Sequence, residues 1–259
     1  MILLTLALLA TTAAADGLPS SGSVGVTPHA SYSSSVGVLG CKINTNRIAY
    51  WPYSVDCNNI CVSLSYGGRT QTLLRIDQSG GAYDVSYDAW NYLYTGYYAT
   101  QKPTTGGAIT MTYEVVSPSK CADIINTSHH KLPLSASNSI DFLVSCLDQE
   151  DSWVADNYVL YNIQDPLCSY GVDETCTLNL TASNQPTCKN TLGIDTALTT
   201  DPVYNIEYGT GEKVLATNNA EAAATATPEP DSSAVKYGAR LSRAQLFIMI
   251  MSLSAFMMH

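Results

Sequence analysis

The chain of 259 residues is long enough for one sizeable domain or two small ones, and its 46 % hydrophobic content excludes a wholly disordered protein. Its 22 acidic and 12 basic residues give a net charge of −10, which argues against a general nucleic-acid binder, because phosphate contacts need Lys and Arg. The 17 Tyr residues, beside 3 Phe and 3 Trp, suit a surface that meets polar ligands with ring faces and hydroxyls.

The N-terminus has the pattern of a secretory signal peptide. An apolar run at residues 2–10 is followed by Ala13-Ala14-Ala15, which predicts cleavage after Ala15. The alternative, a membrane anchor, would need about 20 apolar residues, and this run is shorter. Residues 1–15 are therefore predicted to be the signal peptide.

Strand patterns dominate the first half of the chain. Residues 61–66 alternate in polarity, Gly67-Gly68 suits a tight hairpin turn, and residues 70–77 return as a second strand. Residues 108–116 also alternate, with apolar side chains on one face. This spacing predicts a half-buried strand.

Short helices are expected as well. Ser86 can cap the first helix and Gly96 can end it. Its inward stripe is predicted to consist of Ala89, Trp90, Leu93 and Tyr94. In the second half, residues 140–147 have the apolar spacing of a helix face, and residues 153–163 contain the β-prone run YVLYNI.

The C-terminal part is predicted to be a stalk and a lipid-attachment signal. Ala, Thr, Pro and Ser dominate from about residue 216, so residues 201–233 are assigned to a stalk that O-glycans can decorate. Small residues, a polar spacer and an apolar run to Met258 then follow the pattern of a glycosylphosphatidylinositol (GPI) anchor. Attachment is expected at Ser232 or Ser233, with residues 234–259 as the propeptide; the alternative is a tail anchor or a merely hydrophobic end.

Eight cysteines lie between the two ends and predict disulfides formed in an oxidising compartment. They are Cys41, Cys57, Cys61, Cys121, Cys146, Cys168, Cys176 and Cys188. Two sequons predict N-glycosylation at Asn126 and Asn179. The adjacent His129 and His130 fit a surface loop, because a metal site needs further ligands at workable spacing. We therefore expect no metal and no cofactor.

The most distinctive stretch, residues 57–96, resembles the double-psi β-barrel of barwin-like, expansin-like and RlpA-like proteins, a group that includes the cerato-platanins. Paired cysteines Cys57 and Cys61 open a hairpin strand, a later strand ends in Asp77, and a Gly-Gly turn leads into the motif Tyr83-Asp84-Val85-Ser86. The resemblance implies a mainly β protein, with a six-stranded double-psi barrel and short helices at residues 24–121. Residues 122–200 have no counterpart and are expected to form a disulfide-rich α+β extension or small second domain.

The sequence departs from the family at two places. Three residues separate Cys57 from Cys61 where the family usually has two, and Ala82 stands where the family often has His. By analogy with the family, Cys41 would pair with Cys57 and Cys61 with Cys121. The other four cysteines would then pair among themselves.

The resemblance also assigns a role to Asp84. Its counterpart lines a polysaccharide groove in expansin-like proteins and is the general acid in related endoglucanases and lytic transglycosylases. An inverting hydrolase needs a second carboxylate as base, about 6.5–9.5 Å away. The related endoglucanases take it from the first strand, but no Asp or Glu occurs between Gly17 and Val55. Hydrolysis is therefore disfavoured, although a single-carboxylate transglycosylase stays open.

Each of these carboxylates has a structural alternative. Asp77 could replace the missing base only if the barrel brings it into the groove, and bonding within the barrel is the alternative. Asp84 could instead cap the helix start or bond local backbone amides. The expected sugar-stacking surface consists of Tyr83, Tyr87, Tyr97 and Tyr98. Packing around a small core is the alternative for these tyrosines.

These features predict a fungal-type, GPI-anchored glycoprotein at the plasma membrane or cell wall. It would bind or loosen β-glucan, chitin or cellulose without hydrolysis, as a monomer that does not bind nucleic acid. One alternative is a lytic transglycosylase or endoglucanase with Asp84 as general acid. The other is a non-catalytic wall component or secreted effector that contacts another protein.

Overall fold

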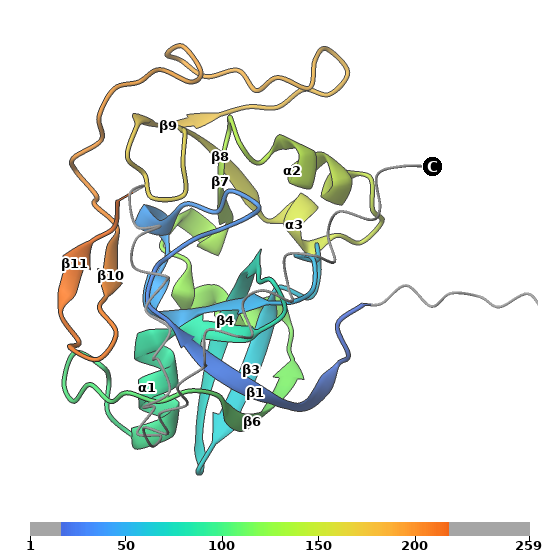
Figure 1. Ribbon diagram of the computed structural model, residues 1–259. Coiled ribbons are helices and arrows are strands. Elements are labelled where there is room, and N and C mark those ends of the chain that lie inside the picture. Colours follow the sequence, from blue (N-terminus) through green and yellow to red (C-terminus); the bar gives the residue numbers. More distant parts are fainter. Residues whose placement is uncertain (1–16, 218–259) are drawn as a thin grey trace, which may run out of the picture. The chain divides into compact units, whose positions relative to one another are not determined.

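The computed structural model describes residues 17–217 (Figure 1). The predicted signal peptide at residues 1–15, the serines Ser232 and Ser233, and the propeptide at residues 234–259 lie outside the described residues. Among residues 17–217, no helix is both long and apolar enough to cross a membrane.

Six strands close into a barrel in the order β1-β5-β2-β4-β3-β6. The strands are β1 (Ser21–His29), β2 (Ile48–Trp51), β3 (Cys61–Tyr66), β4 (Arg69–Gln78), β5 (Tyr83–Ser86) and β6 (Ile109–Val115). β1 pairs with β5, and β2 with β4, in parallel, while the other neighbours run antiparallel. The predicted fold class, a mainly β protein with a six-stranded double-psi barrel, is confirmed.

The hairpin of β3 and β4 is confirmed at the predicted place. Gly67 and Gly68 join the strands with φ values of +57° and +77°, a turn that suits glycine because side chains disfavour positive φ. The predicted half-buried strand is β6, and it buries Met111 and Tyr113. The periodicity of the sequence was therefore a sufficient guide to these elements.

Helix α1 (Tyr87–Thr95) follows β5 directly and ends at Gly96, whose φ is +87°. Its buried Trp90 donates a hydrogen bond from Nε1 to the carbonyl of Val26, at 3.1 Å, and so ties the helix to β1. The expected inward position of Tyr94 is wrong, because this side chain is 39 % exposed. The buried face of α1 instead contains Tyr87, Asp88 and Asn91 beside the predicted Ala89, Trp90 and Leu93.

Ser86 precedes α1 as predicted, but its side chain does not cap the helix. Its hydroxyl instead donates to the carbonyl of Thr45 at 2.7 Å and accepts from the backbone N–H of Ile48 at 3.0 Å. Tertiary partners therefore replace the expected local bond. This contact links the end of β5 to the short 3₁₀ turn η2 (Thr45–Arg47).

The extension forms a second sheet in the order β7-β8-β9, shown above the barrel in Figure 1. Its elements are β7 (Leu132–Ser135), α2 (Ile140–Leu147), α3 (Trp153–Asp156), β8 (Tyr158–Ile163) and β9 (Gly171–Cys176). The predicted helix at residues 140–147 is α2. Ile48 and Leu74 of the barrel share one apolar cluster with Leu143 and Leu160 of the extension. The extension therefore packs on the outside of the barrel.

Three further 3₁₀ turns connect the strands and helices. They are η1 (Gly40–Lys42), η3 (Pro118–Ile124) and η4 (Ser128–His130). The segment between η1 and η2 contacts η3, since the N–H of Asn44 donates to the carbonyl of Ile124 at 2.8 Å. Residues between β1 and β2 thus contact the segment that leaves the barrel.

The predicted start of the stalk at residue 201 is wrong. Residues 204–215 form a hairpin of β10 (Tyr204–Ile206) and β11 (Lys213–Leu215), and Val203 and Ile206 are buried. Short alternating runs around a turn, rather than a long apolar stretch, make these strands, so the composition of the segment concealed them. The rest of the predicted stalk, residues 218–233, lies outside the described residues.

All eight cysteines are in disulfides, but the pairing corrects the family analogy. Cys61 pairs with Cys121, as expected, and Cys176 pairs with Cys188 within the extension. The expected Cys41–Cys57 pair is wrong. The remaining bonds, Cys41–Cys168 and Cys57–Cys146, join the barrel region to the extension. The shared core brings these cysteines together, and that contact is tertiary.

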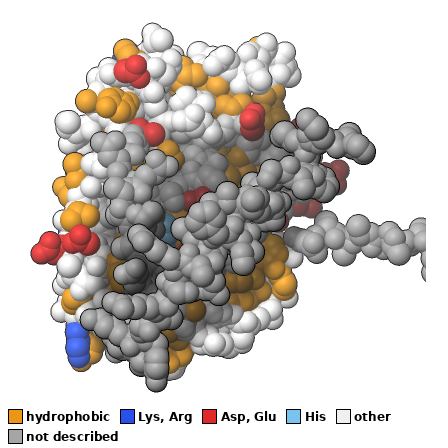
Figure 2. Space-filling model, viewed as in Figure 1, with side chains coloured by type: hydrophobic (Ala, Val, Ile, Leu, Met, Phe, Trp, Pro, Cys, Tyr) orange, Lys and Arg blue, Asp and Glu red, His pale blue; other side chains and the backbone are white. Residues whose placement is uncertain are grey.

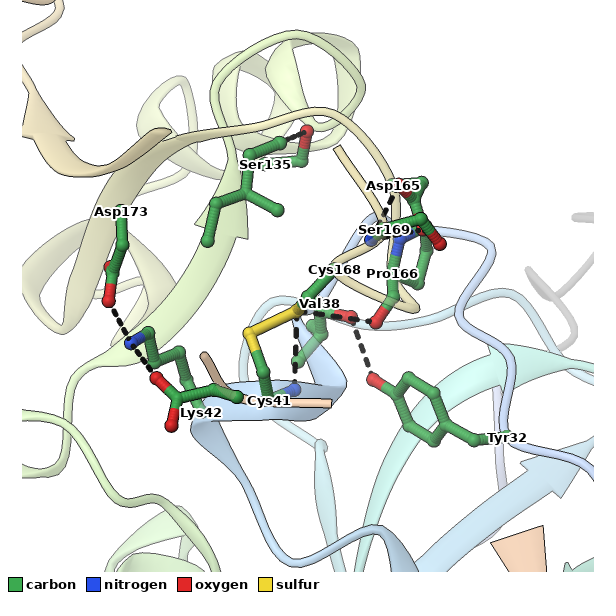
Figure 3. Close-up of a disulfide and its surroundings, with 12 residues drawn as sticks. Tyr32, Val38, Cys41, Lys42, Ser135, Asp165, Pro166, Cys168, Ser169 and Asp173 are labelled. Atoms are coloured by element: carbon green, nitrogen blue, oxygen red, sulfur yellow. Dashed lines mark hydrogen bonds and ion pairs between the residues drawn. A yellow bond between two sulfur atoms is a disulfide. The ribbon is translucent and has the colours of Figure 1, made fainter. Parts of the chain in front are cut away.

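Figure 3 shows the Cys41–Cys168 bond and its surroundings. Beside it, the ammonium group of Lys42 lies 2.7 Å from a carboxylate oxygen of Asp173 in the extension. The hydroxyl of Tyr32 donates to the carbonyl of Val38 at 2.7 Å in the same region. A covalent bond and an ion pair therefore join the barrel region to the extension, and a buried hydrogen bond orders the loop on the barrel side.

A disulfide that joins the barrel region to the extension should stabilise the protein more than the disulfide within the extension. The paired change Cys41→Ser and Cys168→Ser should lower the free energy of unfolding by about 4 kcal/mol, because the nested Cys57–Cys146 bond leaves only residues 41–57 and 146–168 in the released loop. Serine at both Cys176 and Cys188, 12 residues apart, should lower it by about 3 kcal/mol, because the loop released in the unfolded chain is shorter. Urea unfolding of the mature protein measures both values, and equal losses would contradict the expectation.

Candidate functional site

Four neighbouring strands present polar side chains at one level on the outer face of the barrel. Asp84 on β5 lies opposite Thr27 on β1 and opposite Tyr50 on β2, and Tyr50 lies opposite Asp77 on β4. His29 follows Thr27 by two residues on β1, so it projects from the same face. We call these five residues the polar strip.

Asp84 is the partly exposed carboxylate of the polar strip. One of its oxygens accepts a hydrogen bond from the hydroxyl of Thr27 on the neighbouring strand. Its second oxygen has no hydrogen-bond partner among the described residues. Asp84 can therefore offer an acceptor to a ligand without breaking a bond within the protein.

Asp77 is the second carboxylate, and it is only 9 % exposed. Oδ1 accepts from the backbone N–H groups of Ser35 and Gln78, each at 2.8 Å. Oδ2 accepts from the hydroxyl of Ser33 at 2.5 Å. Since both oxygens already have donors, this geometry matches the structural alternative for Asp77, in which it holds the loop after β1 against β4.

The chemistry of the strip follows from this difference. The position on β1 opposite Asp84 carries the hydroxyl of Thr27, which is no base at neutral pH. The other carboxylate, Asp77, is buried and hydrogen-bonded on both oxygens. The strip thus has one available carboxylate and lacks the free pair that activates water in an inverting glycosidase.

His29 and Tyr50 add two neutral groups to the strip. Their rings lie 4.5 Å apart, centroid to centroid. Burial lowers the pKa of His29 from 6.5, although Asp84 and Asp77 oppose this shift, and burial raises the pKa of Tyr50 well above 10. Near pH 7 the imidazole is therefore neutral and has one donor and one acceptor nitrogen.

Sequence reasoning identified Asp84 and Asp77 but missed Thr27, His29 and Tyr50. The signal that could have found Thr27 and His29 is the alternation Val26-Thr27-Pro28-His29, which places both side chains on one face of a strand. Tyr50 lies in the buried run IAYW of β2, which shows no such alternation. Its place in the strip depends on pairing with β4 and β5, which are distant in sequence.

The four predicted sugar-stacking tyrosines do not form one surface. Tyr87 is 1 % exposed, and its hydroxyl bonds the backbone of Thr104, so its expected exposed role is wrong. Tyr83 is half-buried, with its ring 5.3 Å from that of the buried Trp51. Its hydroxyl lies 3.4 Å from the hydroxyl of Tyr53. Tyr83 therefore packs against the core of the barrel.

Tyr97 and Tyr98 are the exposed members, at 51 % and 41 %. Tyr98 stacks on Tyr92 at 4.9 Å with an interplanar angle of 19°. The ammonium group of Lys102 lies 5.1 Å from the ring centre of Tyr97. We call Tyr92, Tyr97 and Tyr98 the tyrosine platform. Tyr92 lies in the last turns of α1, and Tyr97 and Tyr98 follow the helix, whereas Asp84 precedes it. The full helix, about 14 Å long, therefore lies between Asp84 and Tyr97.

The two predicted glycosylation sites, Asn126 and Asn179, are both exposed. In the second sequon, Oδ1 of Asn179 accepts hydrogen bonds from the hydroxyl of Thr181 at 2.7 Å and from its backbone N–H at 3.2 Å. Exposure is a requirement for a surface glycan. Modification at either asparagine stays a prediction.

Comparison with solved structures finds similarity to a cerato-platanin. No family model matches the sequence, and no curated protein matches it. The crystal structure of cerato-platanin 2 from M. perniciosa is 20 % identical, with a TM-score of 0.28; the match covers 39 % of this chain and 98 % of that one. At this identity and TM-score the match supports no inference about function, and the fold assignment depends on the strand pairing described above.

The two carboxylates should differ in their effect on stability. Asp77→Ala removes the acceptor of two backbone N–H groups and one hydroxyl, so the free energy of unfolding should fall by about 2 kcal/mol. Asp84→Ala removes one hydroxyl contact at a partly exposed position and should cost less than about 1 kcal/mol. Urea unfolding of both variants tests this order, and a larger loss for Asp84→Ala would reverse the assignment.

His29 should titrate below pH 6.5, and Asp84→Asn should lower its pKa further, because a negative charge that favours the imidazolium is lost. The unfolded chain then binds a proton at a higher pH than the folded one. The free energy of unfolding should therefore fall as the pH drops from about 6.5 through the folded pKa. NMR titration of the His29 ring measures the shift, and Asp141→Asn on the exposed side of α2 is the matched control. An unchanged pKa in Asp84→Asn would contradict the proximity of the two groups.

Proposed function

We propose that this protein is a cell-surface polysaccharide-binding protein that does not hydrolyse its ligand. The observation that carries the proposal is the difference in exposure and hydrogen bonding between the carboxylates of Asp84 and Asp77. Asp84 is partly exposed with one unbonded oxygen among the described residues, whereas Asp77 is buried and hydrogen-bonded on both oxygens. A single acceptor beside neutral polar groups suits hydroxyl recognition better than activation of water.

The polar strip offers a set of groups that match a neutral sugar. Asp84 accepts hydrogen bonds from sugar hydroxyls, and neutral His29 can donate or accept one. The net charge of −10 disfavours polyanions, so neutral polymers such as β-glucan, chitin and cellulose are the proposed ligands. Figure 2 shows acidic side chains scattered over the viewed face, and few Lys or Arg among them.

The tyrosine platform is proposed to contact the same polymer at a second place. Its exposed rings can stack on the C–H faces of sugar rings, and Lys102 lies over Tyr97. A polysaccharide is long enough to meet two features that α1 separates. Binding to an insoluble polymer would then exceed binding to a short oligosaccharide, because two contacts on one polymer raise the effective affinity.

The proposed location is the outer surface of the cell. Four disulfides among the described residues suit an oxidising compartment. A GPI anchor at Ser232 or Ser233 would hold the domain at the plasma membrane, and glycans at Asn126 and Asn179 would project from exposed positions. The protein would reach the wall polymer from this tether.

A lytic transglycosylase is the second candidate. It needs one carboxylate and no activated water, and the free oxygen of Asp84 satisfies this minimum. Binding and cleavage must therefore be measured together.

The test is a pulldown of the secreted protein on insoluble chitin, β-glucan and cellulose, with release of soluble sugar assayed from the same samples. We expect binding without sugar release. Asp84→Asn and Tyr97→Ala should each weaken binding about tenfold, the loss of roughly one good hydrogen bond or ring contact. Tyr170→Ala is the matched control, because this tyrosine is 44 % exposed on the extension.

Each other outcome would be decisive. Sugar release that Asp84→Asn abolishes would make the protein an enzyme. Absence of binding to all three polymers would exclude both carbohydrate functions and favour a wall component that contacts another protein.

A further inference from the structure

A cavity of about 390 Å³ lies between residues 40–46 and the β10–β11 hairpin. Its volume is in the range of sites that hold small ligands. Its polar lining includes Asn44, Thr45, Asn46, Asp201, Tyr204 and Lys213. The hairpin that forms one wall comes from residues 204–215, outside the barrel, so the cavity exists only because this segment folds back on the chain.

The polar groups of the cavity retain capacity for a ligand. Oδ1 of Asn44 accepts from the backbone N–H of Asn46 at 3.1 Å, while the side-chain amide of Asn46 has no hydrogen-bond partner among the described residues. The ammonium group of Lys213 lies 4.1 Å from the ring centre of Tyr204. Asp201 supplies a carboxylate, one oxygen of which is 3.5 Å from Lys42.

This combination favours a neutral polar ligand. One carboxylate and one ammonium group among the lining residues leave no net charge in the cavity. Amide, hydroxyl and ring groups together match the hydroxyls and C–H faces of a sugar. An anionic or cationic ligand would meet a like charge as well as an opposite one.

The cavity also adjoins the polar strip. Thr45 and Asn46 line a much smaller space, of about 10 Å³, whose other walls include His29 and Tyr50 of the strip. The hydroxyl of Ser86, two residues beyond Asp84 on the same face of β5, donates to the carbonyl of Thr45 at 2.7 Å. Two residues of the strip and two of the cavity wall thus border one space, and Ser86 joins β5 to the cavity wall.

We propose that this cavity is a second saccharide subsite, which binds a sugar unit of the same chain whose neighbouring units lie over Asp84 and His29. The inference rests on the proposed binding function, and it adds a site outside the barrel. Asn46 supplies hydrogen bonds to the sugar hydroxyls, and Tyr204 supplies a ring. The β10–β11 hairpin thereby lengthens the binding surface beyond the four strands of the strip.

The test is the affinity of the mature protein for soluble hexasaccharides of β-1,3-glucan, chitin and cellulose, measured by calorimetry. Asn46→Ala should weaken binding of the preferred hexasaccharide about tenfold, as should Asp84→Asn, since each removes hydrogen bonds at its own subsite. Asn59→Ala, an exposed amide in the loop before β3, is the matched control and should bind like the wild type. Lys213→Ala, at an exposed position on β11, is a second variant that tests the cavity even if Asn46→Ala folds poorly.

The corresponding monosaccharide separates the two subsites. Because a single sugar unit fills only one subsite at a time, its binding should weaken in only one of the variants Asp84→Asn and Asn46→Ala. Wild-type affinity for the hexasaccharide in both Asn46→Ala and Lys213→Ala would overturn the second subsite and leave the proposed function intact. Absence of hexasaccharide binding by the wild-type protein would overturn the second subsite, and failure on the insoluble polymers as well would overturn the proposed function.

Discussion

Closure of the barrel through two parallel strand pairs is the constraint on which the site depends. It places β1, β5, β2 and β4 side by side, although other segments separate them along the chain. Residues on one face of these strands then meet at one level, and Thr27, Tyr50, Asp77 and Asp84 become neighbours. Without the parallel pairing of β1 with β5, Asp84 would lose the hydrogen bond from the hydroxyl of Thr27.

The same outer face divides into an apolar part and a polar part. Ile48, Leu74 and Ile76 are buried in the cluster that includes the extension, whereas the strip keeps Asp84 partly exposed. The Cys41–Cys168 and Cys57–Cys146 bonds hold the extension over the apolar part. The extension therefore completes the core of the molecule and at the same time limits the surface that a polymer can reach.

Two carboxylates of the same type have different environments because of their burial and their donors. Asp77 receives hydrogen bonds on both oxygens from residues 33–35 and Gln78, so its charge is used within the fold. Asp84 receives one hydroxyl and keeps an oxygen for a ligand. His29 is close enough to both for their charges to act on its pKa, which makes it a reporter of the site as well as a member.

By itself, the sequence determined the elements that depend on local periodicity and turn chemistry. The Gly67-Gly68 hairpin, α1 with its Gly96 end, β6 and α2 all lie where their patterns predicted them, and the short motif around Asp84 indicated the barrel fold. Local signals sufficed there because neighbouring residues decide strand alternation, helix faces and positive φ.

Only the tertiary structure decided which distant residues meet. The pairing of Cys41 and Cys57 with the extension, the buried position of Tyr87 and the fold of residues 204–215 all depend on packing between segments far apart in the chain. The polar strip also depends on such packing, since the sequence around His29 and Tyr50 does not show that they lie near Asp84. The sequence shows which chemical groups are present, whereas burial and tertiary contacts determine which of these groups are accessible to a ligand.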